Sequence, residues 1–146
     1  IDPVVVKQEH FTEEDGYTAL ELLLEVDPDI TGVLCFSDTL AHGVMLAGQD
    51  RGLELPRDLS VVGFDDSPLA ARLRPALTTV WQDVGEKGRL AAAALARVVS
   101  AAGSSRAAGA DLSGLDGGQE PLHVVLPTRL VVRESTAAPA RAPAVD

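Results

Sequence analysis

The sequence predicts an α/β fold built on a partial, doubly wound and mostly parallel sheet. Segments in which every second residue is apolar alternate along the chain with segments in which apolar residues recur about every 3.6 residues. The first period is typical of strands and the second of helices, so strands and helices alternate. The continuous apolar run GVLCF predicts a strand that is buried on both faces. Polar residues follow three of the expected strands, at the end of the strand where open α/β sheets bind their ligands.

The first half of the chain contains three expected strands and two expected helices. Thr12 and Asp15 have the spacing of a capping box and mark the start of the first helix. Ser37 or Asp38 begins the second helix, and Gly52 ends it as a left-handed C-cap. The strands are expected at residues 4–7, 32–36 and 59–64.

The second half contains a strand at 78–82 and an alanine-rich helix at 85–100 that faces inward through Leu90, Ala94 and Leu95. Residues 101–121 are rich in Gly, Ser and Ala without periodicity, which predicts a mobile loop. Two short strands are expected at 123–126 and 130–133, followed by a disordered tail at 137–146.

Composition and charge exclude several functions. The formal net charge of −10 argues against direct contact with nucleic acid, because phosphate binding requires clustered Lys and Arg. No apolar run approaches the roughly 18 to 20 residues that span a bilayer, and the single cysteine, Cys35, fits a reducing cytoplasm. The motifs of common hydrolases, nucleotide-binding proteins and zinc proteases are absent, so we expect neither an enzyme nor a cofactor.

Three residues are candidates for ligand contacts: Ser37, Asp65 and Gln82 each stand at the end of an expected strand. A carboxylate accepts two hydrogen bonds from a diol, and an amide both donates and accepts, so the set suits a hydroxylated or heterocyclic small molecule. Ser37 has an equally good explanation as a helix N-cap. Asp65 precedes Asp66, and two adjacent carboxylates repel each other unless each has a partner.

Other polar and aromatic residues favour structural roles. Asp38 at a helix start is better explained by the helix dipole than by ligand contact. Trp81 alternates with Gln82 and therefore points to the opposite side of its strand, where packing is the better explanation. His10 and His123 have no second histidine or cysteine at ligand spacing, so no metal site is expected.

Two segments carry a resemblance to a known family. The stretches CFSDTLAHG at 35–43 and LSVVGFDDSPLAARLRPALTTVWQD at 59–83 resemble the effector-binding core of LacI/GalR-type bacterial transcriptional regulators in order and spacing. The resemblance runs from about residue 1 to about residue 139 and fails across 103–121. It implies a periplasmic-binding-protein-like fold of type I, with a sugar or purine-like effector bound at the positions of Ser37, Asp65 and Gln82. The family commonly has Asn at the position of Ser37.

The resemblance also implies partners and a division of the chain. It implies a cytoplasmic homodimer that contacts operator DNA only through an N-terminal helix-turn-helix, which these residues lack. The C-terminal lobe would occupy 1–78 without its first strand and helix, 79–126 would cross to the other lobe, and 127–136 would return. We therefore expect marginal stability for the chain alone, and no direct pairing between the strands at 4–7 and 32–36. The residues expected at the dimer interface are Leu40, His42, Met45, Leu69 and Leu73.

Two alternatives remain open on the sequence. A periplasmic solute-binding protein of a sugar transporter shares the two lobes and the three ligand positions. The run RPALTTVWQD and the ending VVREST favour the regulators. An orphan α/β interaction module is the third interpretation, and a ligand that perturbs Trp81 would argue against it. His42 is either a solvated surface residue or a contact with a partner subunit.

Overall fold

The computed structural model describes residues 3–107 and 123–139, and these form two compact units. The first unit draws on residues 1–82 and 128–146, and the second on residues 83–127. Residues 79–82 therefore belong with the first unit rather than with the segment that crosses away from it. Most of the expected tail, 140–146, lies outside the described residues.

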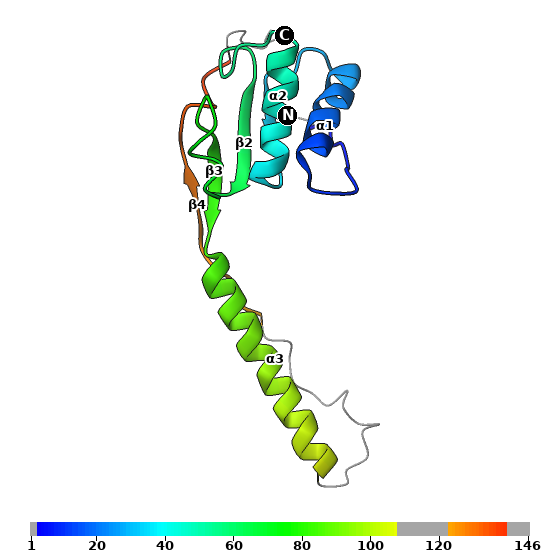
Figure 1. The fold of residues 1–146 in the computed structure, drawn as a ribbon, viewed down its shortest axis with the longest axis vertical. Coiled ribbons are helices and arrows are strands. Elements are labelled where there is room, and N and C mark those ends of the chain that lie inside the picture. The colour runs from blue at the N-terminus through cyan, green and yellow to red at the C-terminus, as the bar shows by residue number, and fades with distance from the viewer. Residues whose placement is uncertain (1–2, 108–122, 140–146) are drawn as a thin grey trace. The chain divides into compact units, whose positions relative to one another are not determined.

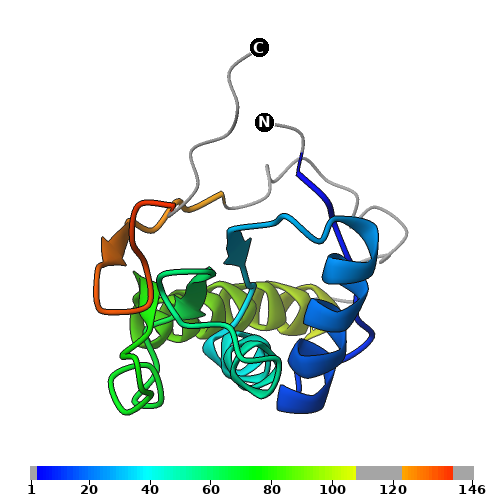
Figure 2. The same cartoon turned by 90° about the horizontal axis from the view of Figure 1, so that it is seen from above.

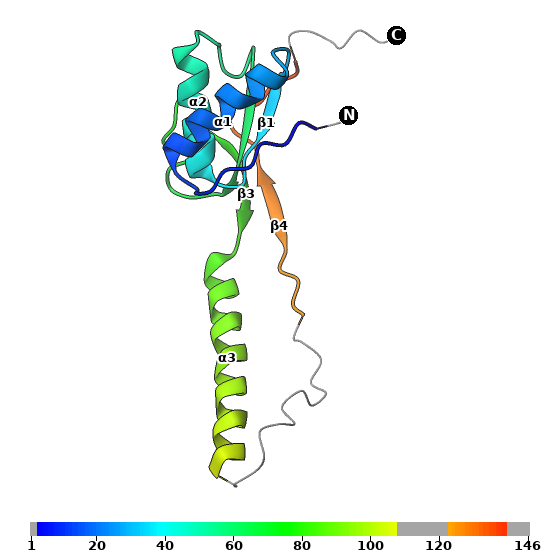
Figure 3. The same cartoon turned by 90° about the vertical axis from the view of Figure 1, so that its right-hand side faces the viewer.

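The first unit is built on four strands: β1 (Gly32–Leu34), β2 (Ser60–Asp65), β3 (Thr78–Gln82) and β4 (Thr128–Val131). They form one sheet in the order β1-β2-β3-β4, of which Figure 1 shows β2, β3 and β4 side by side. β1, β2 and β3 are parallel, and β4 runs antiparallel beside β3 (Figure 3). The mostly parallel sheet is thus confirmed, and the carboxyl ends of three strands meet at one edge.

Two helices, α1 (Glu13–Val26) and α2 (Asp38–Asp50), pack on each other on one side of this sheet (Figure 2). The capping box is confirmed, since the Thr12 hydroxyl accepts from Asp15 N and the Asp15 carboxylate accepts from Thr12 N. Ser37 is the N-cap of α2, and Gly52 follows its end with a φ of 77°. Local sequence therefore determines where both helices begin and where α2 ends.

The hydrophobic core lies between the two helices and the sheet face that they cover. Its largest members, such as Leu20, Met45 and Leu59, are fully buried, and each contributes about 1.5–3 kcal/mol relative to an exposed side chain. The buried apolar residues are Leu20, Cys35, Ala41, Val44, Met45, Ala47, Leu59, Val61, Ala70, Leu73 and Leu77.

The prediction that β1 is buried on both faces is wrong. Leu34 is 69% exposed, and Phe36, just beyond the strand, is 77% exposed. β1 is the outermost strand among the described residues, and the helices of this unit cover only one face of the sheet. Leu130 and Val132 are likewise exposed. An apolar run indicates that both faces of a strand are hydrophobic. It does not indicate whether another helix or strand covers each face.

The expected strand at 4–7 is also wrong, because these residues form neither a helix nor a strand. Val5 is 70% exposed there. Residues 4–7 do not pair with β1, as expected, since β1 is an outer strand of the sheet and its partner is β2. β-propensity alone does not hold a segment in a sheet when no neighbouring strand supplies hydrogen bonds.

The segment after β4 forms hydrogen bonds with the amino ends of β2 and β3. Ser135 is fully buried, and its hydroxyl donates to Val61 O (2.6 Å) and accepts from Thr78 N (2.8 Å). Its backbone N–H also donates to Ala76 O at 3.0 Å. This segment therefore provides hydrogen-bond partners for backbone groups at the start of β2 and β3 that do not bond to each other. The strand expected at 130–133 is observed two residues earlier, at 128–131.

The second unit consists mainly of α3 (Val84–Ala107). The helix is longer than predicted and occupies the first seven residues of the expected loop, while 108–121 lie outside the described residues. No strand forms at 123–126. Leu90 and Ala94 line a shallow pocket of about 180 Å³ together with Val124 and Leu126, whereas Leu95 is 64% exposed, against the prediction that it faces inward.

Candidate functional site

The candidate site lies at the sheet edge where β1, β2 and β3 end. Because these strands are parallel, their carboxyl ends meet at the same edge. Ser37 follows β1, Asp65 is the last residue of β2, and Gln82 is the last residue of β3. In open α/β sheets this edge is where ligands bind.

Asp65 and Gln82 are in direct contact. The Gln82 amide Nε2 donates to Asp65 Oδ1 at 2.6 Å, and both side chains are half-buried. Asp65 has a φ of 108°, a backbone conformation that side chains other than glycine rarely adopt. The contact orients the carboxylate at the end of β2 and leaves Oδ2 as a further acceptor for a hydroxyl or an N–H of a ligand.

Ser37 takes the structural role that the sequence left open. Its Oγ accepts from Leu40 N at 3.1 Å and caps α2, rather than bonding to Asp65 or Gln82. The hydroxyl hydrogen of a capping serine remains available as a donor. Ser37 therefore lies at the expected edge, but the structure joins only the other two candidates.

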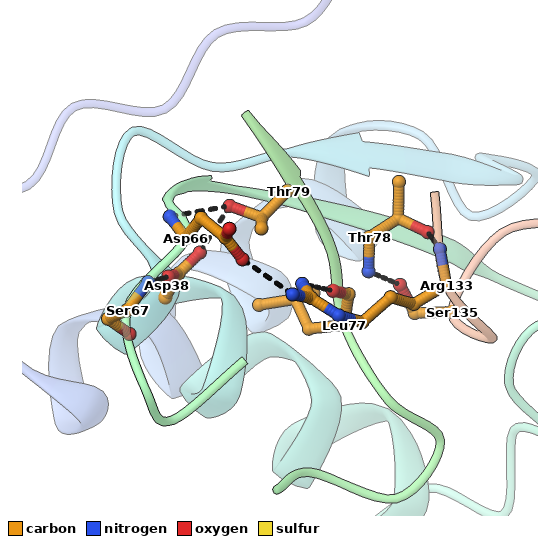
Figure 4. A network of polar contacts seen from close by, with 8 residues as sticks. All are labelled: Asp38, Asp66, Ser67, Leu77, Thr78, Thr79, Arg133 and Ser135. Atoms are coloured by element: carbon orange, nitrogen blue, oxygen red, sulfur yellow. Dashed lines mark hydrogen bonds and ion pairs between the residues drawn. The ribbon is translucent and has the colours of Figure 1, made fainter. Parts of the chain in front are cut away.

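Asp38 has a role that sequence reasoning missed. It is 2% exposed, and its Oδ1 accepts from Thr79 Oγ1 (2.6 Å) while Oδ2 accepts from Ser67 N (2.7 Å) (Figure 4). A buried carboxylate is tolerated because such hydrogen bonds replace water. Asp38 thus ties the start of α2 to β3 and to the turn after β2. Its helix-start position gave no sign of this contact.

A second missed residue is Arg133, which pairs with Asp66. Arg133 Nη2 lies 2.6 Å from Asp66 Oδ1, and the two side chains are only 21% and 15% exposed. Arg133 Nη1 donates to Leu77 O at 2.9 Å, so one guanidinium connects two segments (Figure 4). The repulsion expected between Asp65 and Asp66 was the signal that a cation should be near, although it did not identify which one.

The aromatic side chain next to the site has a cationic neighbour. Arg129 of β4 faces Trp81 of β3 in the antiparallel register, and its guanidinium carbon lies 4.9 Å from the centre of the indole ring. This is cation–π geometry. Trp81 is therefore half-buried against Arg129 of the neighbouring strand, and strand alternation predicts that it points to the side opposite to Gln82.

The expected dimer residues lie mostly inside this chain. Met45 and Leu73 are 2% and 8% exposed and belong to the hydrophobic core, so they are not available to a partner subunit. Leu40 and Leu69 are half-buried against the same core. His42 Nδ1 lies 2.5 Å from Glu13 Oε2 and joins α2 to α1. The resemblance implied that these residues contact a partner subunit, whereas Met45 and Leu73 contact the core of their own chain.

Cys35, between β1 and α2, is a buried structural residue. Burial raises the pKa of its thiol to about 12, so the thiolate that reacts with electrophiles or binds metal is disfavoured. Within the described residues no cluster of His, Cys, Asp or Glu could hold a metal ion. Among the same residues, no helical segment combines the length and the hydropathy that a membrane span requires.

The arrangement is suited to recognition of a polar small molecule. A carboxylate oriented by an amide, next to a capped helix start, presents acceptors and donors within one sheet edge. The carboxylate of Asp65 is held by Gln82, and that of Asp66 is neutralised by Arg133. Of these two carboxylates, Asp65 is therefore the one we assign to accept hydrogen bonds from a ligand.

Comparison with known proteins gives a consistent result. The family model for the periplasmic binding protein-like domain matches residues 2–136. The ribose operon repressor of Haemophilus influenzae is 41% identical over 91 residues, which are 62% of this chain and 27% of the repressor. The chain spans about a quarter of the length of the curated relatives that it matches.

Solved structures show the same fold. A LacI family transcriptional regulator from Arthrobacter sp. FB24, in complex with lactose, is 32% identical, with a TM-score of 0.61, over 86% of this chain and 42% of that one. A LacI family regulator from Enterococcus faecium with bound ribose is 27% identical, with a TM-score of 0.65, over 88% of this chain and 41% of that one.

Proposed function

Because the chain belongs to the family of periplasmic-binding-protein-like domains, within its LacI/GalR branch, we propose that it is the effector-binding part of a transcriptional regulator. Its effector is a sugar or a similar hydroxylated or purine-like metabolite. The observation that carries this proposal is the contact between Asp65 and Gln82 at the ends of β2 and β3. The longer protein would be a cytoplasmic homodimer whose separate DNA-binding heads contact the operator.

Several observations support a sensor over a catalyst. The reported relatives are transcriptional regulators, and two similar structures hold lactose and ribose. The site offers hydrogen-bonding groups, and its nearby thiol has a pKa that keeps it neutral. A ligand that favours one closure of the two lobes would change operator affinity by an allosteric coupling of about 1–3 kcal/mol.

The relatives also favour a regulator over a transport receptor. The family description covers periplasmic binding proteins, whereas the similar proteins reported above are a repressor and two LacI family regulators. The gene sequence upstream of this segment tests the choice: a helix-turn-helix supports the regulator, and a signal peptide contradicts it.

Removal of the Asp65 carboxylate tests the site. In the full-length protein, Asp65→Ala should weaken effector binding about 10- to 150-fold, because an ionised acceptor contributes roughly 1.5–3 kcal/mol. Calorimetric titration with D-ribose, lactose and adenosine measures the dissociation constants, and operator binding with and without each ligand measures the coupling.

Asp58→Ala is the matched control, because it removes a carboxylate that pairs with Arg57 in another part of the unit. Its effector affinity should equal that of the wild type. Unchanged affinity in Asp65→Ala would show that the site is assigned to the wrong residue.

A further inference from the structure

The turn that presents Asp65 is held by contacts on both sides. Asp65 and Asp66 have φ values of 108° and 53°, so two consecutive residues adopt positive φ, which is uncommon outside glycine. Such strain persists only where surrounding contacts over-determine it. The contacts that hold this turn therefore decide where the Asp65 carboxylate points.

The interactions of Asp66 and Ser67 are the ones that fix this conformation. Asp66 N donates to Thr79 Oγ1 at 3.4 Å, and Ser67 N donates to the buried carboxylate of Asp38 at 2.7 Å. The Asp66 side chain is held by Arg133 at 2.6 Å. The contacts with Asp38 and with Arg133 each involve an ionised group, so both are stronger than the 3.4 Å hydrogen bond to the Thr79 hydroxyl.

Arg133 is itself held in place. Its backbone N–H donates to Thr78 Oγ1 (2.9 Å) and its Nη1 donates to Leu77 O (2.9 Å), both at the start of β3. The backbone of Arg133 is therefore held at β3 while its side chain extends to the turn at Asp65 and Asp66. The planar guanidinium donates to the Leu77 carbonyl and to the Asp66 carboxylate at the same time (Figure 4).

From this geometry we infer that Arg133 is a positioning residue for effector recognition, acting on Asp65 through Asp66. The inference rests on the proposed function of Asp65. Arg133 follows β4, and β4 is the strand by which the chain returns from the second unit. Through Arg133 the returning strand controls the geometry of the ligand-binding carboxylate.

Hydrogen exchange of the full-length protein without ligand tests the positioning role. In Arg133→Met, a peptide covering 65–69 should exchange at least tenfold faster, while a peptide covering 59–63 in the same strand should not change. Arg57→Met is the control, because it removes another ion-paired arginine, one that contacts Glu54 and Asp58, and it should alter neither peptide. Faster exchange in both peptides, or in neither, would overturn the inference.

Binding measurements test whether the effect passes through Asp65. With whichever of D-ribose, lactose and adenosine binds the wild type, Arg133→Met should weaken binding about tenfold. Arg133→Lys keeps the positive charge but not the planar guanidinium, so it should weaken binding less than Arg133→Met does. In the Asp65→Ala background, the Arg133→Met change should weaken binding by less than twofold. An equal tenfold loss in both backgrounds would mean that Arg133 does not act through Asp65.

The outcomes separate the inference from the proposed function. A loss of affinity in Asp65→Ala without a loss in Arg133→Met refutes the inference and leaves the site intact. A wild type that binds no member of the panel counts against the proposed function, and the exchange result then decides the role of Arg133.

Discussion

At the residue scale, the adjacent carboxylates of Asp65 and Asp66 have different partners and therefore different roles. Gln82, 17 residues along the chain, donates to Asp65, and Arg133, 67 residues along, neutralises Asp66. One carboxylate is thus kept for a ligand and the other for the architecture. Their sequence neighbours do not distinguish these roles, because Gln82 and Arg133 come from distant parts of the chain.

Cys35 gives a residue-scale prediction about pH. Its thiol has a pKa of about 12 in the folded chain against about 9 when exposed, so above pH 9 the unfolded chain releases a proton that the folded chain keeps. The stabilisation is complete below about pH 9 and is lost as the pH rises toward 12. Between pH 8 and pH 10 the free energy of unfolding should fall by about 1.4 kcal/mol from this group.

Urea unfolding at the two pH values, in the wild type and in Cys35→Ala, measures this contribution. The alanine variant removes the thiol. Between pH 8 and pH 10 its free energy of unfolding should therefore fall by about 1.4 kcal/mol less than that of the wild type. Equal pH dependence in the two proteins would show that the thiol is not buried as described.

At the element scale, the crossing of α1 and α2 depends on two glycines that allow backbone contact. A Cβ at Gly16 would collide with the carbonyl oxygen of Leu40, and a Cβ at Gly43 would collide with that of Glu13. These are backbone atoms, which cannot move aside without separating the helices. The close approach also lets His42 of α2 reach Glu13 of α1.

Gly16→Ala should therefore lower the free energy of unfolding by about 1–3 kcal/mol, the usual cost of overpacking. Gly48→Ala on α2 is the matched control. Its Cβ would meet the side chain of Leu55 at 3.6 Å, an ordinary contact, and alanine favours a helix by about 0.5–1 kcal/mol. Urea unfolding followed by circular dichroism compares the two. Equal stability of the two variants would contradict the close crossing.

At the scale of the whole molecule, the described residues leave apolar side chains uncovered in both units. Leu34, Phe36, Leu130 and Val132 are exposed in the first unit, and Leu95, Val98 and Val99 are exposed in the second. Large apolar surfaces of this kind are normally buried against another element or partner. In the longer protein that we propose, further segments would cover them.

The 146-residue chain expressed alone should consequently be less stable than the full-length protein and should bind a hydrophobic dye such as ANS. Its fluorescence with the dye should exceed that of an equal concentration of the full-length protein. Its urea midpoint should lie lower. A chain that excludes the dye and unfolds at the same urea concentration would show that these surfaces are covered within the chain itself.

Much of the fold was predictable because it is encoded locally. The capping box of Thr12 and Asp15, the cap at Ser37 and the left-handed Gly52 each depend on neighbours within a few residues. β3 at 78–82 agrees with its alternating pattern. The strand at 4–7 and the end of α3 were not predictable, because pairing partners and helix length depend on what a segment packs against.

The sequence by itself determined the α/β class, the family resemblance and the strand ends that carry Ser37, Asp65 and Gln82. Only the tertiary structure decided that Asp65 joins Gln82, that Asp38 is buried, that Arg133 holds Asp66, and that Met45 and Leu73 face the core. The physical reason is the sequence separation between the residues that interact. Caps and periodicity act over a few residues, whereas hydrogen bonds between strand ends form only after the sheet brings distant residues together.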